Sequence, residues 1–113
     1  MAYVLDLNRS HDYTLELTLM DKDRTTLLIG LPTEAMQQEL ADIGDGLQKM
    51  ATGDKQSITM IYELAARLIS RNRNFVTVTA EELRTKYRMD IESAIIFFSA
   101  YLDFLSKVTN EKN

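Results

Sequence analysis

Residues 90–105 form the stretch that decides the fold, and they read Asp90-Ile91-Glu92-Ser93-Ala94-Ile95-Ile96-Phe97-Phe98-Ser99-Ala100-Tyr101-Leu102-Asp103-Phe104-Leu105. The pattern predicts a helix that is capped by Asp90 and continues to about Val108. A surface helix of a small domain needs only one apolar stripe. One stripe here has the spacing of a core face and contains Ile91, Ala94, Ile95, Phe98, Leu102 and Leu105. A second stripe lies on the flanks and contains Ile96, Phe97, Ala100, Tyr101, Phe104 and Val108.

The second stripe has two interpretations. Either a partner protein covers it, or the rest of the fold surrounds the helix and buries it. A small domain has few elements with which to surround a helix on all sides. The candidate partner-binding or self-associating face consists of Ile96, Phe97, Tyr101 and Phe104. Burial of these residues in the core remains the alternative interpretation.

The overall composition is that of one folded domain. A chain of 113 residues supports one hydrophobic core, so residues 1–113 are expected to form a single domain. The formal net charge of −4 argues against an extended nucleic-acid surface. Cysteine is absent, which excludes disulfides and thiolate metal sites. Neither a signal peptide nor a membrane-spanning apolar run is recognisable, so the expected location is a cytoplasm.

The first part of the chain, residues 1–31, predicts a short antiparallel β meander. Apolar residues alternate with polar ones over 3–7 and 13–19, and 25–31 is a third β-leaning run. Polar segments between these runs predict the turns. Three short strands are marginal alone, so a helix is expected to pack against one face.

The remainder, residues 32–108, predicts a mainly helical body, and 109–113 a frayed tail. About four helices are expected, at approximately 33–53, 55–71, 80–88 and 90–108. The predicted fold class is therefore α+β, a short antiparallel meander followed by a helical body.

Several residues predict where these helices begin or bend. Thr33 is the expected N-cap of the first helix. Gly44 and Gly46 lie inside that helix and predict a kink or a split, because each costs about 1 kcal/mol relative to alanine. Thr79 and Glu82 have the spacing of a capping box.

No group of residues predicts catalysis. The run Ser10-His11-Asp12 contains the residue types of a hydrolase triad, but adjacent side chains on an extended segment point in opposite directions, so a turn is expected. Asp21 and Asp23 could suggest a Mg²⁺ site, yet they lie in a predicted turn with no phosphate loop in the chain. We expect no enzymatic activity, no metal and no cofactor.

The charge distribution provides an alternative function. Residues 67–88 contain six basic and two acidic side chains, a local net charge of +4 in an acidic chain. The basic residues are Arg67, Arg71, Arg73, Arg84, Lys86 and Arg88. Such a patch, with Phe75 or Tyr87 for base stacking, is compatible with a small nucleic-acid-binding regulator. An acidic protein partner, or simple capping of helix ends by arginine, explains the same pattern.

The second half of the chain resembles the tail assembly chaperones of long-tailed, siphovirus-type phages and prophages. The resemblance rests on three stretches, covers about half of the chain and contains no catalytic motif. The stretches are Leu68-Ile69-Ser70-Arg71-Asn72-Arg73-Asn74, Val78-Thr79-Ala80-Glu81-Glu82-Leu83, and the helix from Ala94 to Leu105.

This resemblance implies a function in virion assembly without catalysis. Members of the family are thought to bind the tape measure protein, keep it soluble and help to recruit tail tube subunits. The implied partners are therefore the tape measure protein and the major tail tube protein, in the cytoplasm of a bacterial host. Self-association into a homo-oligomer is a further expectation, whereas nucleic acid and membrane are not expected partners.

Overall fold

The computed structural model describes the backbone of residues 14–112 and the side chains of residues 14–108. It contains a two-stranded antiparallel sheet followed by five helices, which confirms the α+β prediction. The elements are β1 (Leu15–Thr18), β2 (Thr26–Ile29), α1 (Glu34–Ala41), α2 (Ile43–Ala51), α3 (Lys55–Ile69), α4 (Ala80–Thr85) and α5 (Ile91–Lys112). The strand expected at 3–7 and the Ser10-His11-Asp12 segment lie outside the described residues.

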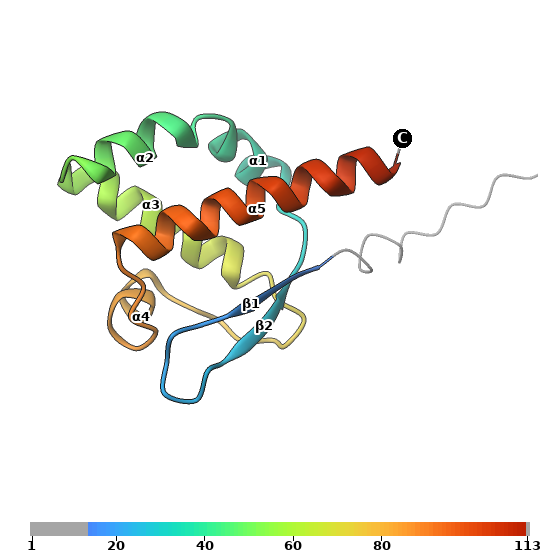
Figure 1. The fold of residues 1–113 in the computed structure, drawn as a ribbon, viewed down its shortest axis with the longest axis horizontal. Helices are drawn as coiled ribbons and strands as arrows, with labels where there is room; N and C mark the ends of the chain where they lie inside the picture. The colour runs from blue at the N-terminus through green and yellow to red at the C-terminus, as the bar shows by residue number, and fades with distance from the viewer. Residues whose placement is uncertain (1–13, 113) are drawn as a thin grey trace, which may run out of the picture.

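Helix α3 is the centre of the fold. It contacts α1, α2, α4, α5 and β2, and Leu68 and Ile69 near its end are fully buried. Figure 1 shows α5 crossing the molecule between the α1–α2 arm and the sheet, with α4 beside the sheet. Because one helix contacts almost every other element, the fold has a single hydrophobic core.

The sheet is a hairpin whose apolar side faces the helices. Leu15 is paired with Ile29 and Leu17 with Leu27, so these side chains lie on one face, and both β2 residues are buried. The turn is closed by Asp21, whose carboxylate accepts hydrogen bonds from the backbone N and the Oγ1 of Thr25 at 2.7 and 2.5 Å. These hydrogen bonds hold the pKa of Asp21 below its ordinary value and assign this carboxylate a structural role.

The outer edge of β2 is covered by the segment after α3. The backbone N of Gly30 donates to the carbonyl of Arg71 at 2.8 Å, and the backbone N of Arg73 donates to the carbonyl of Leu28 at 2.9 Å. Ile29 and Asn72 therefore form an isolated antiparallel bridge. The segment after α3 thus continues the sheet beyond β2 and ties the helical body to the hairpin.

The predicted first helix is split, but not at its glycines. The break falls at Asp42, which caps α1 and precedes α2, and both Gly44 and Gly46 lie within α2. A Cβ atom on Gly46 would lie 3.4 Å from the Cδ1 of Ile61, so the glycine accommodates the close approach of α2 to α3. The split raises the helix number from the expected four to five.

The predicted helix starts are confirmed. The Oγ1 of Thr33 accepts from the backbone N of Met36, and the capping box of Thr79 and Glu82 is complete in both directions. At the start of α5 the carboxylate of Asp90 accepts from the backbone N of Ser93 at 2.7 Å. Polar residues that precede an apolar pattern therefore marked these boundaries correctly.

The second apolar stripe of α5 is partly core, which makes the expectation of an exposed face wrong for Phe97 and Tyr101. Phe97 is 3% exposed and Tyr101 0%, while Phe104 is partly buried against the core. Of the four residues of the candidate face, only Ile96, 61% exposed, lies on the surface, and Ala100 of the same stripe is also exposed. The buried face combines members of both predicted stripes, because the sheet packs over the flank that a helical body alone would have left open.

Candidate protein-binding groove

An apolar groove lies between β1 and the first half of α5. It is a hollow of about 310 Å³, at the lower end of the range of about 300–1,000 Å³ typical of ligand pockets. Its side chains come from β1 and the residues after it, from the α4–α5 link and from α5. They include Leu15, Leu17, Leu19, Met20, Tyr87, Met89, Ser93, Ile96, Phe97 and Ala100.

Strand alternation places the leucines of β1 in this groove. Leu15 and Leu17 are only half-buried although they lie on the core face of the hairpin, and Leu19 after them is buried. Ile96 and Met20 are exposed at the rim. The hydroxyl of Ser93 lies 3.8 Å from the sulfur of Met20 and joins the two walls. The groove therefore has a fixed apolar wall and two exposed apolar side chains at its edge.

The floor of the groove is anchored to α3. Tyr87 and Met89 are buried, and the carbonyl oxygen of Met89 accepts a 2.8 Å hydrogen bond from the hydroxyl of Tyr62. Burial raises the pKa of Tyr62 above its ordinary value, so this hydroxyl remains a donor at neutral pH. This buried hydrogen bond therefore ties the floor of the groove to α3.

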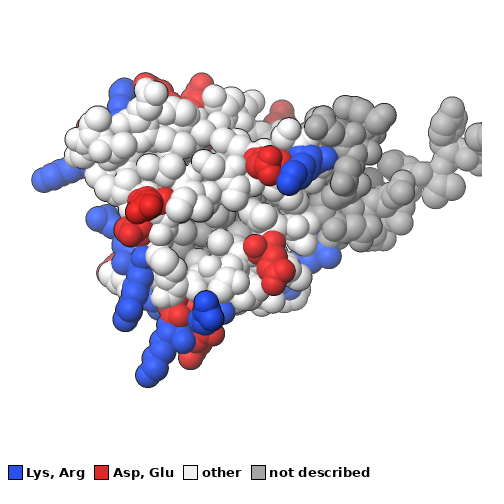
Figure 2. Space-filling view, viewed as in Figure 1, with Lys and Arg blue, Asp and Glu red and all other residues white. Residues whose placement is uncertain are grey.

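The electrostatics of the groove favour an apolar ligand. Glu16 is the one ionisable acid that lines it. Figure 2, drawn from the same side as Figure 1, shows a largely uncharged face with a few scattered acidic groups and most basic side chains near its edges. A surface of this kind can bury apolar side chains of a partner.

The acidic residues considered for metal binding serve other purposes. Among the described residues, no three or more metal-ligating side chains come together. Asp21 caps the hairpin turn, and its neighbour Asp23 is exposed. The absence of a metal site and of enzymatic activity stays a prediction for the chain as a whole.

The six basic residues of the 67–88 patch do not form one track. Arg67 forms an ion pair with Glu39 of α1. Arg84 lies over the ring of Tyr62 at 5.0 Å, and Lys86 over that of Tyr87 at 5.2 Å. Arg88 has a φ of 54° and follows the end of α4. These four residues are therefore used separately in helix pairing, cation–π contacts and helix termination.

Arg71 and Arg73 are the two members of the patch that share a hollow. They line a second cleft, beside the residues that follow β2, and this cleft has no lining residue in common with the groove. Phe75 belongs to the same cleft, while Tyr87 is buried in the groove floor and is unavailable for stacking. The structure therefore reduces the predicted basic patch to one arginine pair and one aromatic side chain.

Sequence reasoning missed most of the groove. It selected Ile96 and Phe97, but not the leucines of β1, nor Met20 and Met89. The alternation over 13–19 identified a half-buried strand, yet nothing local in the sequence shows that this strand lies beside α5. The pairing depends on tertiary contacts.

Comparison with protein-family models, with curated proteins and with solved structures found no match to this chain. A search of the described helices for a membrane span found none of sufficient length and apolar character.

Proposed function

We propose that this protein binds an apolar segment of a partner protein and acts by binding alone. The single observation that supports this function is the groove between β1 and α5, with Ile96 61% exposed at its rim. Burial of an exposed isoleucine contributes roughly 1.5–3 kcal/mol to association. The flexible thioethers of Met20 and Met89 can adapt to different apolar side chains.

The segment we propose as ligand is an amphipathic helix. The groove is narrow, apolar and bordered on one side by a helix, so it can accept side chains spaced three or four residues apart on a partner. The resemblance of residues 68–105 to tail assembly chaperones supports the tape measure protein of a long-tailed phage as the partner, since that protein is a long helical chain. In this proposal the protein keeps the tape measure soluble and helps to recruit tail tube subunits, in the cytoplasm of the bacterial host.

Co-expression with the tape measure protein of the same phage tests the proposal. The variant Ile96→Ser removes the exposed apolar rim, and Met60→Ser is the matched control, because Met60 on α3 is 62% exposed and lies outside the groove. We expect Ile96→Ser to reduce co-purification of the tape measure protein by about tenfold, and Met60→Ser to leave it unchanged. Equal recovery with both variants would exclude this groove as the binding site.

A further inference from the structure

Phe75 has a left-handed backbone conformation and an exposed aromatic side chain. Its φ is +58°, in the left-handed region that side chains larger than glycine adopt at a cost of about 1–2 kcal/mol. Its ring is 97% exposed, so the protein gains no burial in return. Strained residues of this kind are concentrated at functional sites.

The loop that carries Phe75 is fixed by one side chain. The amide oxygen of Asn72 accepts from the backbone N of Asn74 at 3.1 Å and of Val76 at 3.0 Å. The amide nitrogen of Asn72 donates to the carbonyl oxygens of Ile69 at 2.8 Å and Val76 at 2.6 Å. These hydrogen bonds fix the backbone on both sides of Phe75 and so determine where its exposed side chain leaves the loop.

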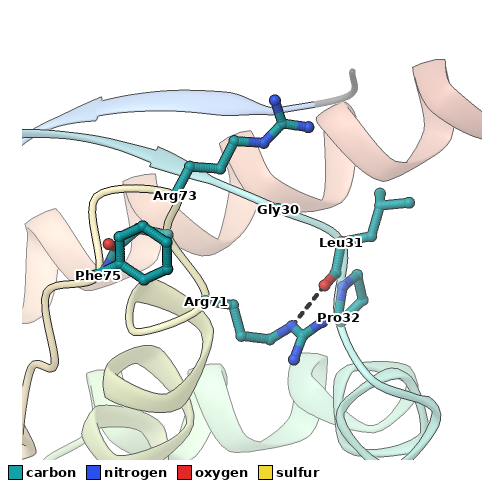
Figure 3. A pocket seen from close by; sticks show the side chains of 7 residues that line it. Gly30, Leu31, Pro32, Arg71, Arg73 and Phe75 are labelled. Atoms are coloured by element: carbon teal, nitrogen blue, oxygen red, sulfur yellow. Dashed lines mark hydrogen bonds between the residues drawn. The ribbon is translucent and has the colours of Figure 1, made fainter. Parts of the chain in front are cut away.

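Phe75 stands at the edge of a cleft of about 790 Å³. Figure 3 shows Phe75 and Arg71 on one side of the opening, with Leu31 and Pro32 facing them from the segment that follows β2. The Nε of Arg71 donates a 2.7 Å hydrogen bond to the carbonyl of Leu31 across the cleft. This contact orients the guanidinium of Arg71 and leaves its two terminal nitrogens for a ligand.

The charged side chains that line the cleft are all basic. Arg71 and Arg73 are its ionisable lining residues, and neither has an acidic partner among the side chains of residues 14–108. Both arginines are exposed, and the rest of the lining is Gly30, three apolar residues and Asn72, whose side chain is hydrogen-bonded within its own loop. The cleft therefore combines an anion-binding element with an apolar one.

We propose that this cleft binds a short acidic segment of a partner protein. A carboxylate of the segment accepts hydrogen bonds from Arg71, a second carboxylate pairs with Arg73, and an apolar side chain of the segment packs on Phe75. A long nucleic acid is a poorer fit, because three of the other four basic residues of the 67–88 patch pair with Glu39, Tyr62 and Tyr87 and the chain has a net charge of −4. The proposal does not depend on the groove between β1 and α5.

Fluorescence polarisation with the full chain tests this site. The probe is a labelled peptide of alternating aspartate and leucine, compared with the same peptide carrying asparagine for aspartate and with single-stranded DNA. The wild type should bind the aspartate peptide, more weakly as salt is raised, and bind the asparagine peptide about tenfold less tightly. Equal affinity for the two peptides, or tighter binding of the DNA, would overturn the proposal.

Two variants and one control identify the residues. Phe75→Gly removes the ring and relieves the strained φ, so the protein should melt at a higher temperature while its affinity for the peptide falls about tenfold. Arg73→Gln should weaken binding similarly, whereas Arg24→Gln, which removes an exposed arginine of the hairpin turn, should not. Unchanged affinity in Phe75→Gly would contradict the site even if that variant is more stable.

Discussion

The hydroxyl of Tyr101, in the middle of α5, donates a 2.9 Å hydrogen bond to the carbonyl oxygen of Gly30, the residue that follows β2. The Tyr101 ring is fully buried and stacks on the ring of Phe97, with the two ring centroids 5.8 Å apart. One side chain therefore joins the longest helix to the end of the sheet. This contact explains why the flank of α5 that carries Tyr101 is part of the core.

Replacing Tyr101 with phenylalanine should measure that hydrogen bond. Tyr101→Phe keeps the ring packing but leaves the Gly30 carbonyl without its donor, so the free energy of unfolding should fall by about 1 kcal/mol. Tyr101→Ala also removes the ring and should cost about 3–5 kcal/mol. Urea denaturation of both variants checks this order, and equal losses would show that ring packing is not the larger contribution.

The stability of the protein should decrease in strongly alkaline solution. Burial raises the pKa of Tyr101 well above its ordinary value of 10.0. Below pH 10 both the folded and the unfolded state hold this proton, and the stabilisation is fully present. Above pH 10 the unfolded state loses its proton first, so the free energy of unfolding falls as pH rises. Tyr101→Phe should show a shallower decrease from pH 10 upward in denaturation experiments, and an unchanged slope would contradict the assignment.

The two kinds of apolar side chain on α5 should respond differently to substitution. Phe97→Ser removes a buried ring and should destabilise the protein by about 3–5 kcal/mol, enough to unfold a marginal domain. Ile96→Ser changes an exposed side chain and should cost less than about 1 kcal/mol. Thermal melting followed by circular dichroism distinguishes them. A well-folded Phe97→Ser protein with altered self-association would instead support the original interface prediction for this residue.

Glycine at position 88 should stabilise the protein. Arg88 has a φ of 54° where the chain leaves α4, and the backbone N of the next residue, Met89, donates to the carbonyl of Leu83 at 2.7 Å. Because glycine adopts this conformation without a Cβ clash, Arg88→Gly should raise the free energy of unfolding by about 1 kcal/mol.

Lys86→Gly is the matched control for that substitution. Lys86 has an ordinary helical φ of −70° and lies over the ring of Tyr87. Glycine there should lower stability by about 1 kcal/mol, because it adds backbone freedom to the unfolded chain and removes the cation–π contact. If both glycine variants are destabilised, the left-handed conformation of Arg88 is not a source of strain.

The sequence was sufficient to predict where several helices begin, but not which elements pack against one another. Thr33, Thr79 and Asp90 are polar residues directly before apolar patterns, and each caps a helix by a local hydrogen bond. Such bonds depend on residues three positions away, so a single sequence is enough to predict them. The break predicted at Gly44 and Gly46 lies instead at Asp42. Gly46 serves the close approach of α2 to α3, which is a tertiary contact that the local sequence does not reveal.

The candidate sites were less predictable for the same reason. Helical spacing correctly grouped Phe97 with Tyr101 but could not tell whether a sheet or a partner would cover them. The six basic residues of the 67–88 patch do not form the single surface that was predicted from the sequence, since Arg67 and Arg84 have partners on different helices. The left-handed conformation of Phe75 had no sequence signal, because glycine or asparagine would normally mark such a position.

The bridge between Ile29 and Asn72 also constrains how the protein can be made. During synthesis the hairpin of β1 and β2 leaves the ribosome before α3 and the segment that covers β2. The backbone groups of Leu28 and Gly30 then have no chain segment to pair with until Arg71 and Arg73 have emerged. An open strand edge is a site of mispairing between nascent chains. Emergence of residues 71–73, after α3, is therefore the step at which the β2 edge of this hairpin becomes covered.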